Sequence, residues 1–164
     1  MSIRFNADEI YEMAETIEKN GAEFYTEAAG KTADENTKTM LLDMAAMEEG
    51  HLETFHQMRG ELTEREKSEA VYDPDNQVAL YLQTMAKAHG SEGKVSPTQK
   101  LTGQEPIEEI FKIALGAEKD SIAFYSGLKD FVSQKAGKEK VEAIIREELF
   151  HIAMLSQKLA ELKR

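Results

Sequence analysis

The fold of this chain is decided by a stretch that occurs twice, one hundred residues apart. Its first copy is Glu18-Lys19-Asn20-Gly21-Ala22-Glu23-Phe24-Tyr25, and its second is Glu118-Lys119-Asp120-Ser121-Ile122-Ala123-Phe124-Tyr125. Thirty residues after each leading glutamate comes a Glu-x-x-His step, which spans 48–51 in the first half and 148–151 in the second. Four glutamates and two histidines in this pattern are the ligand set of a two-metal site in a four-helix bundle. The duplication therefore predicts a metal site as well as a fold.

The composition indicates one folded domain over residues 1–164, neither disordered nor embedded in a membrane. Hydrophobic residues make up 41% and charged residues 31%, and the apolar runs are too short to cross a bilayer. The net charge of −11 argues against a nucleic-acid partner, because no basic stripe is available for phosphates. The N-terminus has no apolar signal segment, so we expect a cytoplasmic protein without a membrane partner.

The sequence has no cysteine. This excludes disulfides, cysteine-ligated metal sites and cysteine nucleophiles. Any metal must be held by carboxylates and imidazoles, which suit iron, manganese or zinc better than Cu(I) or an iron–sulfur cluster.

Four long segments place apolar residues at the 3.6-residue spacing of an amphipathic helix. They cover about residues 7–30, 34–59, 105–132 and 138–162, the last beginning after Gly137. Short connections join the first segment to the second and the third to the fourth, which predicts two antiparallel hairpins. The connection 60–104 is long enough to cross the bundle, and we expect a short amphipathic helix at 78–89 within it. The predicted fold is all-α, a ferritin-like four-helix bundle with one long crossover.

The repeated glutamates lie on the apolar faces of the predicted helices. Glu18 follows Ala14 by four residues, Glu48 follows Met44 by four, and the second half repeats this relation. Since residues three or four apart share a helix face, each of these glutamates should point into the core, with a histidine one turn beyond the second of each half. Glu147 falls outside the apolar stripe, so we expect it in solvent.

Four converging carboxylates require compensation inside an apolar core. A buried carboxylate is unfavourable unless it is paired or bound to metal, and neighbouring carboxylates raise one another's pKa. Two divalent cations would neutralise four negative charges. The expected ligands are the bridging pair Glu48 and Glu148, the terminal pair Glu18 and Glu118, and one histidine for each metal, His51 and His151. A core of Glu–His hydrogen bonds without metal is the alternative, but it leaves negative charge uncompensated.

A third Glu-x-x-His step, at Glu53 and His56, has no counterpart in the second half, where the matching residues are Ala153 and Ser156. We therefore expect this step at the surface, outside the metal site.

Two tyrosines lie near the predicted ligands. Tyr25 and Tyr125 are two helical turns beyond Glu18 and Glu118 on the same faces. They are candidates for hydrogen bonds to the opposing glutamates, or for donors of an electron or a proton during oxygen chemistry. The alternative is a core tyrosine with a satisfied hydroxyl.

These motifs resemble the rubrerythrin branch of the ferritin-like superfamily. The resemblance rests on Glu18-Lys19-Asn20-x3-Phe24-Tyr25, Glu48-x2-His51, Glu118-Lys119-Asp120-x3-Phe124-Tyr125 and Glu148-x2-His151, within residues 5–60 and 105–162. It implies a non-haem di-iron centre, often in a homodimer, that passes electrons to hydrogen peroxide or dioxygen in defence against oxidants.

Two features depart from the family pattern. Rubrerythrins carry a rubredoxin domain with four cysteines, which this sequence lacks, so the resemblance implies a separate electron-donor protein. Ser121 stands where the family has an additional glutamate, which makes the six-ligand set closer to that of bacterioferritin ferroxidase centres.

We therefore expect a di-iron oxidoreductase that reduces hydrogen peroxide or dioxygen. One alternative is an iron-binding or ferroxidase protein that handles iron without turnover of an external substrate. Another is a structural protein stapled by metal. A manganese or mixed iron–manganese centre would use the same ligands.

Overall fold

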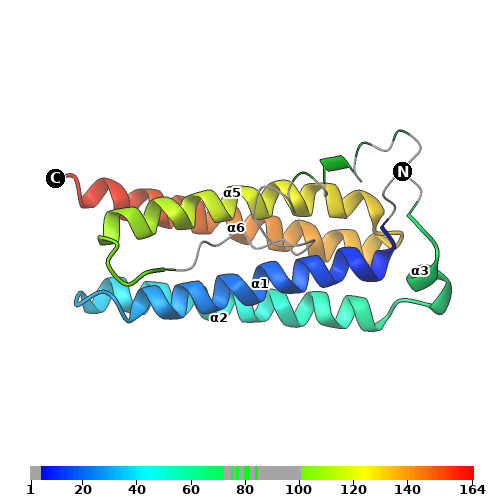
Figure 1. The fold of residues 1–164 in the computed structure, drawn as a ribbon, viewed down its shortest axis with the longest axis horizontal. Helices are drawn as coiled ribbons and strands as arrows, with labels where there is room; N and C mark the ends of the chain where they lie inside the picture. The colour runs from blue at the N-terminus through cyan, green and yellow to red at the C-terminus, as the bar shows by residue number, and fades with distance from the viewer. Residues whose placement is uncertain (1–4, 72–74, 76, 78–79, 82–83, 85–100) are drawn as a thin grey trace.

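Four long helices form the part of the chain that the computed structural model describes, residues 5–71, 75, 77, 80–81, 84 and 101–164 (Figure 1). They are α1 (Ala7–Ala29), α2 (Glu35–Gly60), α5 (Ile107–Phe131) and α6 (Lys135–Glu161). Within these residues there is no β-strand, only an isolated bridge between Asn6 and Ala70. No helix in this set is both long and apolar enough to cross a membrane. The predicted all-α class is confirmed.

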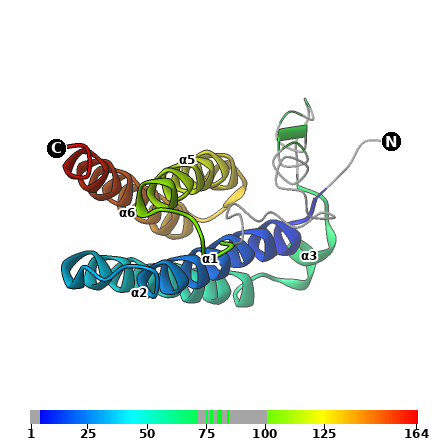
Figure 2. The same cartoon turned by 60° about the vertical axis from the view of Figure 1, so that its left-hand side comes forward.

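The helices pair as two hairpins, α1 with α2 and α5 with α6 (Figure 2). In Figure 1 α2 and α5 run in the same direction, so the end of α2 and the start of α5 lie at opposite ends of the bundle. This is the predicted ferritin-like arrangement. A short helix, α3 (Glu64–Ser68), follows α2 and was not predicted. Most of the helix expected at 78–89 lies outside the described residues.

Side chains close the N-terminal ends of the first two helices. Asn6 accepts a hydrogen bond from the backbone N–H of Glu9 at 2.8 Å, and the Glu9 carboxylate accepts one from the Asn6 N–H at 2.9 Å. At α2 the Asp34 carboxylate accepts from the Thr37 N–H at 2.8 Å. These contacts satisfy backbone donors that have no partner inside a helix, so they define where α1 and α2 begin.

The last helix begins earlier than expected. We predicted a start after Gly137, but α6 begins at Lys135, and Gly137 lies in its first turn. A Cβ atom at this glycine would lie 2.6 Å from Cγ1 of Val132. Gly137 therefore allows the end of α5 to pack closely against the start of α6, and it does not delay the helix.

The apolar core consists of two clusters on either side of a polar layer. One cluster contains Ile10, Phe55 and Leu128, and the other contains Leu41 and Phe111 among its members. The first gathers the N-terminal half of α1 and the C-terminal half of α2, and the second gathers the opposite halves. The four repeated glutamates lie between the two clusters along their helices, so apolar packing encloses the predicted site from both ends.

Candidate metal site

The polar layer is made by the six predicted ligands. Each residue is no more than 4% exposed, and α1 and α5 contribute one residue each while α2 and α6 contribute two each: Glu18, Glu118, Glu48, His51, Glu148 and His151. Their helical phase directs them inward, as the sequence predicted. The structure therefore brings together residues up to 133 positions apart, from 18 to 151.

The six residues form two overlapping groups. One contains Glu18, Glu48, His51 and Glu148, and the other contains Glu48, Glu118, Glu148 and His151. Within each group the potential ligand atoms all lie within 4.8 Å of one another. Glu48 and Glu148 belong to both groups, which is the arrangement that two metal ions sharing two carboxylates would need.

In the first group the ligand atoms surround Nδ1 of His51. This nitrogen lies 3.2 Å from Oε1 of Glu148, 3.3 Å from Oε2 of Glu18 and 3.7 Å from Oε2 of Glu48. Oxygens from three different helices therefore face one imidazole nitrogen.

In the second group the same pattern surrounds Nδ1 of His151. The nitrogen lies 2.9 Å from Oε2 of Glu148, 3.2 Å from Oε1 of Glu118 and 3.3 Å from Oε1 of Glu48. Each shared carboxylate thus turns one oxygen toward His51 and the other toward His151.

The spacing of these atoms fits cations better than hydrogen bonds. Within the described part of the chain, both histidine Nδ1 atoms, both carboxylate oxygens of Glu148 and Oε2 of Glu18 are buried without a hydrogen-bond partner. Adjacent ligands about 2.1 Å from one cation are about 3.0–3.4 Å apart, and the observed separations of 2.9–3.7 Å bracket that range. The donor set therefore fits two divalent metals bound by nitrogen and oxygen.

The pKa values in the polar layer reflect the cost of burying charges that no cation neutralises. Burial, with the charges of Glu148 and Glu48, raises the pKa of Glu118 to about 8. Burial also raises the pKa of Glu18 well above its ordinary range, helped by the neighbouring Glu48 carboxylate. Burial acts to lower the pKa of His151, but the carboxylates of Glu118, Glu148 and Glu48 outweigh it and raise the value to about 12. Without metal, the layer must therefore hold protons to remain buried.

The two predicted tyrosines contact the terminal glutamates across the bundle. The Tyr25 hydroxyl on α1 donates a hydrogen bond to Glu118 on α5, and the Tyr125 hydroxyl on α5 donates to Glu18 on α1. Both rings are no more than 3% exposed. Burial, followed by the charge of the glutamate that it contacts, raises the pKa of each tyrosine well above its ordinary value, so both remain neutral donors.

The outer nitrogens of the two histidines have different partners. Nε2 of His51 lies 2.8 Å from Oε2 of Glu147, whereas Nε2 of His151 lies 3.4 Å from Sδ of Met47. Glu147 is exposed to solvent, as predicted, with 49% of its side chain accessible, but its carboxylate also reaches across to the other hairpin, which was not predicted.

The unmatched Glu-x-x-His step lies at the surface, as predicted. The His56 side chain is 72% exposed and its Nδ1 lies 3.2 Å from Oε1 of Glu15, while the exposed Glu53 accepts a hydrogen bond from Gln57. Neither residue belongs to the buried groups.

A small cavity lies between α1 and α5 beside the polar layer. Its volume is about 10 Å³, about enough for one water-sized molecule, and Gly21, Ser121, Glu48 and Glu118 are among its lining residues. The Ser121 hydroxyl is turned away from the carboxylates, since it donates to the backbone oxygen of Ala117 at 3.0 Å.

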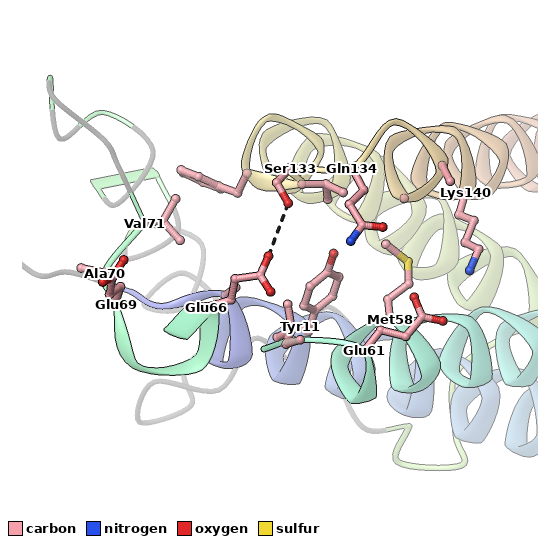
Figure 3. Close-up of a pocket in the computed structure, with 16 residues that line it drawn as sticks. Tyr11, Met58, Glu61, Glu66, Glu69, Ala70, Val71, Ser133, Gln134 and Lys140 are labelled. Atoms are coloured by element: carbon pink, nitrogen blue, oxygen red, sulfur yellow. Dashed lines mark hydrogen bonds between the residues drawn. The ribbon is translucent and has the colours of Figure 1, made fainter. Parts of the chain in front are cut away.

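A larger cavity of about 240 Å³ lies at the end of the bundle where α1 begins and α2 ends (Figure 3). Tyr11, Met58 and Glu66 are among its lining residues, and the Ser133 hydroxyl donates to Glu66 at 3.4 Å. None of the six predicted ligands lines this cavity, so it is separate from the polar layer.

Comparison with known proteins agrees with this geometry. The sequence profile of the Rubrerythrin family matches residues 9–159. Among solved structures, one from Thermotoga maritima described as a ferritin-like diiron-carboxylate protein is 24% identical, with a TM-score of 0.72 over 96% of this chain and 97% of that chain. KatB, a manganese catalase from Anabaena, is 19% identical, with a TM-score of 0.61 over 100% of this chain and 77% of that chain. No curated protein matches the sequence. At these identities the structural likeness establishes the shared fold.

Proposed function

The chain belongs to the rubrerythrin family, as its motifs predicted, and we propose that it is a di-iron oxidoreductase that reduces hydrogen peroxide or dioxygen. The observation that carries this proposal is the buried layer of four carboxylates and two imidazoles, in which both histidine Nδ1 atoms and both Glu148 oxygens lack a hydrogen-bond partner among the described residues. A protein that bound no metal there would gain little from burying so many charges, because apolar residues would stabilise the same core at lower desolvation cost.

Each ligand has a proposed role. Glu48 and Glu148 would be shared by two metal ions, Glu18 and His51 would help to hold one of them, and Glu118 and His151 would help to hold the other. Iron bound there would supply two electrons, one from each ion, to the oxidant. Manganese fits the same donor set and is the alternative metal.

Other residues around the site donate hydrogen bonds to the carboxylates and control what can reach them. Tyr25 and Tyr125 hold the terminal carboxylates by their hydroxyl protons. The small cavity beside Glu48 and Glu118 has room for about one water-sized molecule and marks where a small molecule could approach the carboxylates. The apolar clusters on both sides exclude bulk water, which strengthens the electrostatic interactions within the layer.

The overall reaction requires an external reductant. Reduction of hydrogen peroxide to two waters consumes two electrons and two protons. This sequence has no cysteine to hold a rubredoxin-type or iron–sulfur centre, so we propose that the electrons come from a separate donor protein.

The test is to load the protein with Fe(II) without oxygen and then add hydrogen peroxide. We expect two iron ions per chain, and ferric absorption in the near ultraviolet that is complete after one peroxide per chain. With an artificial one-electron donor present, peroxide consumption should continue through many cycles. Iron that stays ferrous after peroxide addition would refute the oxidoreductase proposal, and oxidation without further turnover would favour an iron-handling role.

Two variants separate the buried layer from the exposed Glu-x-x-His step. Glu148→Ala removes a fully buried carboxylate shared by both groups, so it should abolish the binding of both metals. Glu53→Ala removes an exposed carboxylate outside both groups and should leave two metals per chain. Equal losses in the two variants would contradict the proposed ligand set.

A further inference from the structure

The two halves of the polar layer are nearly equivalent on their inner side. Each histidine Nδ1 faces three carboxylate oxygens, at 3.2–3.7 Å from His51 and at 2.9–3.3 Å from His151. The two rings are 6.2 Å apart between centroids. The hundred-residue repeat therefore builds two metal positions with matching inner ligands.

The two halves differ at the outer nitrogen, Nε2, of each histidine. The difference lies in one pair of repeat positions, 47 and 147. Residue 147 contacts His51 and residue 47 contacts His151, but the first is a glutamate and the second a methionine. Both contacts cross between α2 and α6, so each hairpin supports the histidine of the other. The two partners occupy the same place and differ in their chemistry.

The Glu147 carboxylate can only accept a hydrogen bond, so Nε2 of His51 must donate. This fixes the proton on Nε2 and would leave the Nδ1 lone pair for a cation held among the carboxylate oxygens that face it. A carboxylate behind an imidazole orients the ring and makes it a stronger metal ligand, and losing such a partner lowers metal affinity by about 10–100-fold. The added negative charge also attracts a cation bound to the same ring.

Met47 gives His151 neither a charged hydrogen-bond acceptor nor a nearby negative charge. A thioether sulfur is a weak, uncharged acceptor, and its 3.4 Å contact with Nε2 does little to select one tautomer. The His151 side chain is fully buried, so bulk solvent does not reach it.

We propose that the two metal positions are inequivalent, and that the position of His51 binds a divalent cation more tightly and fills first because Glu147 supports its ligand. This inference rests on the proposed dinuclear site and adds an order of filling to it. Glu147 is a positioning residue, since it acts through His51 and is not in either ligand group.

The experiment is a calorimetric titration with Co(II), which reports stepwise affinity without oxidation chemistry. The wild type should bind two ions in two steps at least tenfold apart. Glu147→Met should weaken the first step by about 10–100-fold, so that the two steps merge. Met47→Glu should tighten the second step by a similar factor and leave the first unchanged. Glu49→Met is the matched control: it removes one exposed carboxylate next to Glu48, and both steps should stay as in the wild type.

Proton resonances of the Co(II)-loaded protein give a second readout that overall stability does not affect. The Nε2 proton of His51 should give a paramagnetically shifted signal that exchanges slowly with water in the wild type, and Glu147→Met should speed that exchange because the proton loses its acceptor. Two bound ions with affinities that Glu147→Met and Glu49→Met change equally would overturn the inequivalence while leaving the dinuclear site intact. Failure of the wild type to bind Co(II) would overturn both.

Discussion

Gly21 is the position where one added methyl group tests the geometry of the polar layer most sharply. It lies inside α1, opposite Glu48, and a Cβ atom there would be 3.3 Å from both Cδ and Oε2 of that carboxylate. Unstrained carbon contacts are about 3.5–4.0 Å, so Gly21→Ala should push the carboxylate aside by about 0.2–0.7 Å. Because Glu48 belongs to both ligand groups, the displacement should affect both metal positions.

The same substitution should not destabilise the metal-free fold. Alanine is about 1 kcal/mol better than glycine inside a helix, and the atoms that must move belong to the end of a flexible side chain. We therefore expect the metal-free variant to unfold at a temperature equal to that of the wild type or up to about 4 °C higher. Metal affinity should fall by about tenfold, because the ligand no longer occupies its place without strain.

The assay combines thermal unfolding of the metal-free protein with Co(II) titration. Gly116→Ala is the matched control, since this glycine lies inside α5 and an added Cβ would have no heavy atom within 4 Å in the described structure. The control should gain about 1 kcal/mol and keep the wild-type affinity for both metals. Wild-type affinity in Gly21→Ala would refute the reasoning that Glu48 is held in place beside α1. A loss of more than 2 kcal/mol of metal-free stability would refute the reasoning that the carboxylate can yield.

Three further predictions concern the core, the tyrosine contacts and pH. Phe55→Ala removes a fully buried ring and should lower the free energy of unfolding by about 3–5 kcal/mol in urea titrations. Leu149→Ala, at an exposed residue, should change it by less than about 0.5 kcal/mol, and similar effects in the two variants would contradict the assigned core. Tyr125→Phe leaves a buried Glu18 oxygen without its donor and should lower the free energy of unfolding of the metal-free protein by about 1–3 kcal/mol in the same assay, and an unchanged value would contradict that contact. Burial and the neighbouring carboxylates raise the pKa of Glu118 to about 8, so below that pH a metal must displace a proton from it. Co(II) affinity should therefore rise between pH 6 and pH 8, and a flat profile would count against Glu118 as a ligand.

The sequence was sufficient to predict the inward ligands because helical phase is a local property. The four-residue steps from Ala14 to Glu18 and from Met44 to Glu48 determine which face each glutamate shares, whatever surrounds the helix. The exposed position of His56 was predicted from the repeat instead, since its Glu-x-x-His step has no counterpart in the second half.

Contacts between the hairpins could not be predicted in this way. Glu147 reaches His51 because α6 lies against α2 at one particular height, which depends on the packing of the whole bundle. The early start of α6 has a similar cause: Gly137 reads as a helix boundary in sequence, but its role is to leave room for Val132. Both residues act through tertiary contacts that no local pattern records.

The central claim is that one chain binds two metal ions in the buried layer. Native mass spectrometry of protein purified without oxygen and loaded with Fe(II) measures this directly. We predict two iron ions per chain in the wild type and none in Glu148→Ala, with the folded charge distribution retained in both. One iron per chain in the wild type, or the same count in both proteins, would contradict the claim.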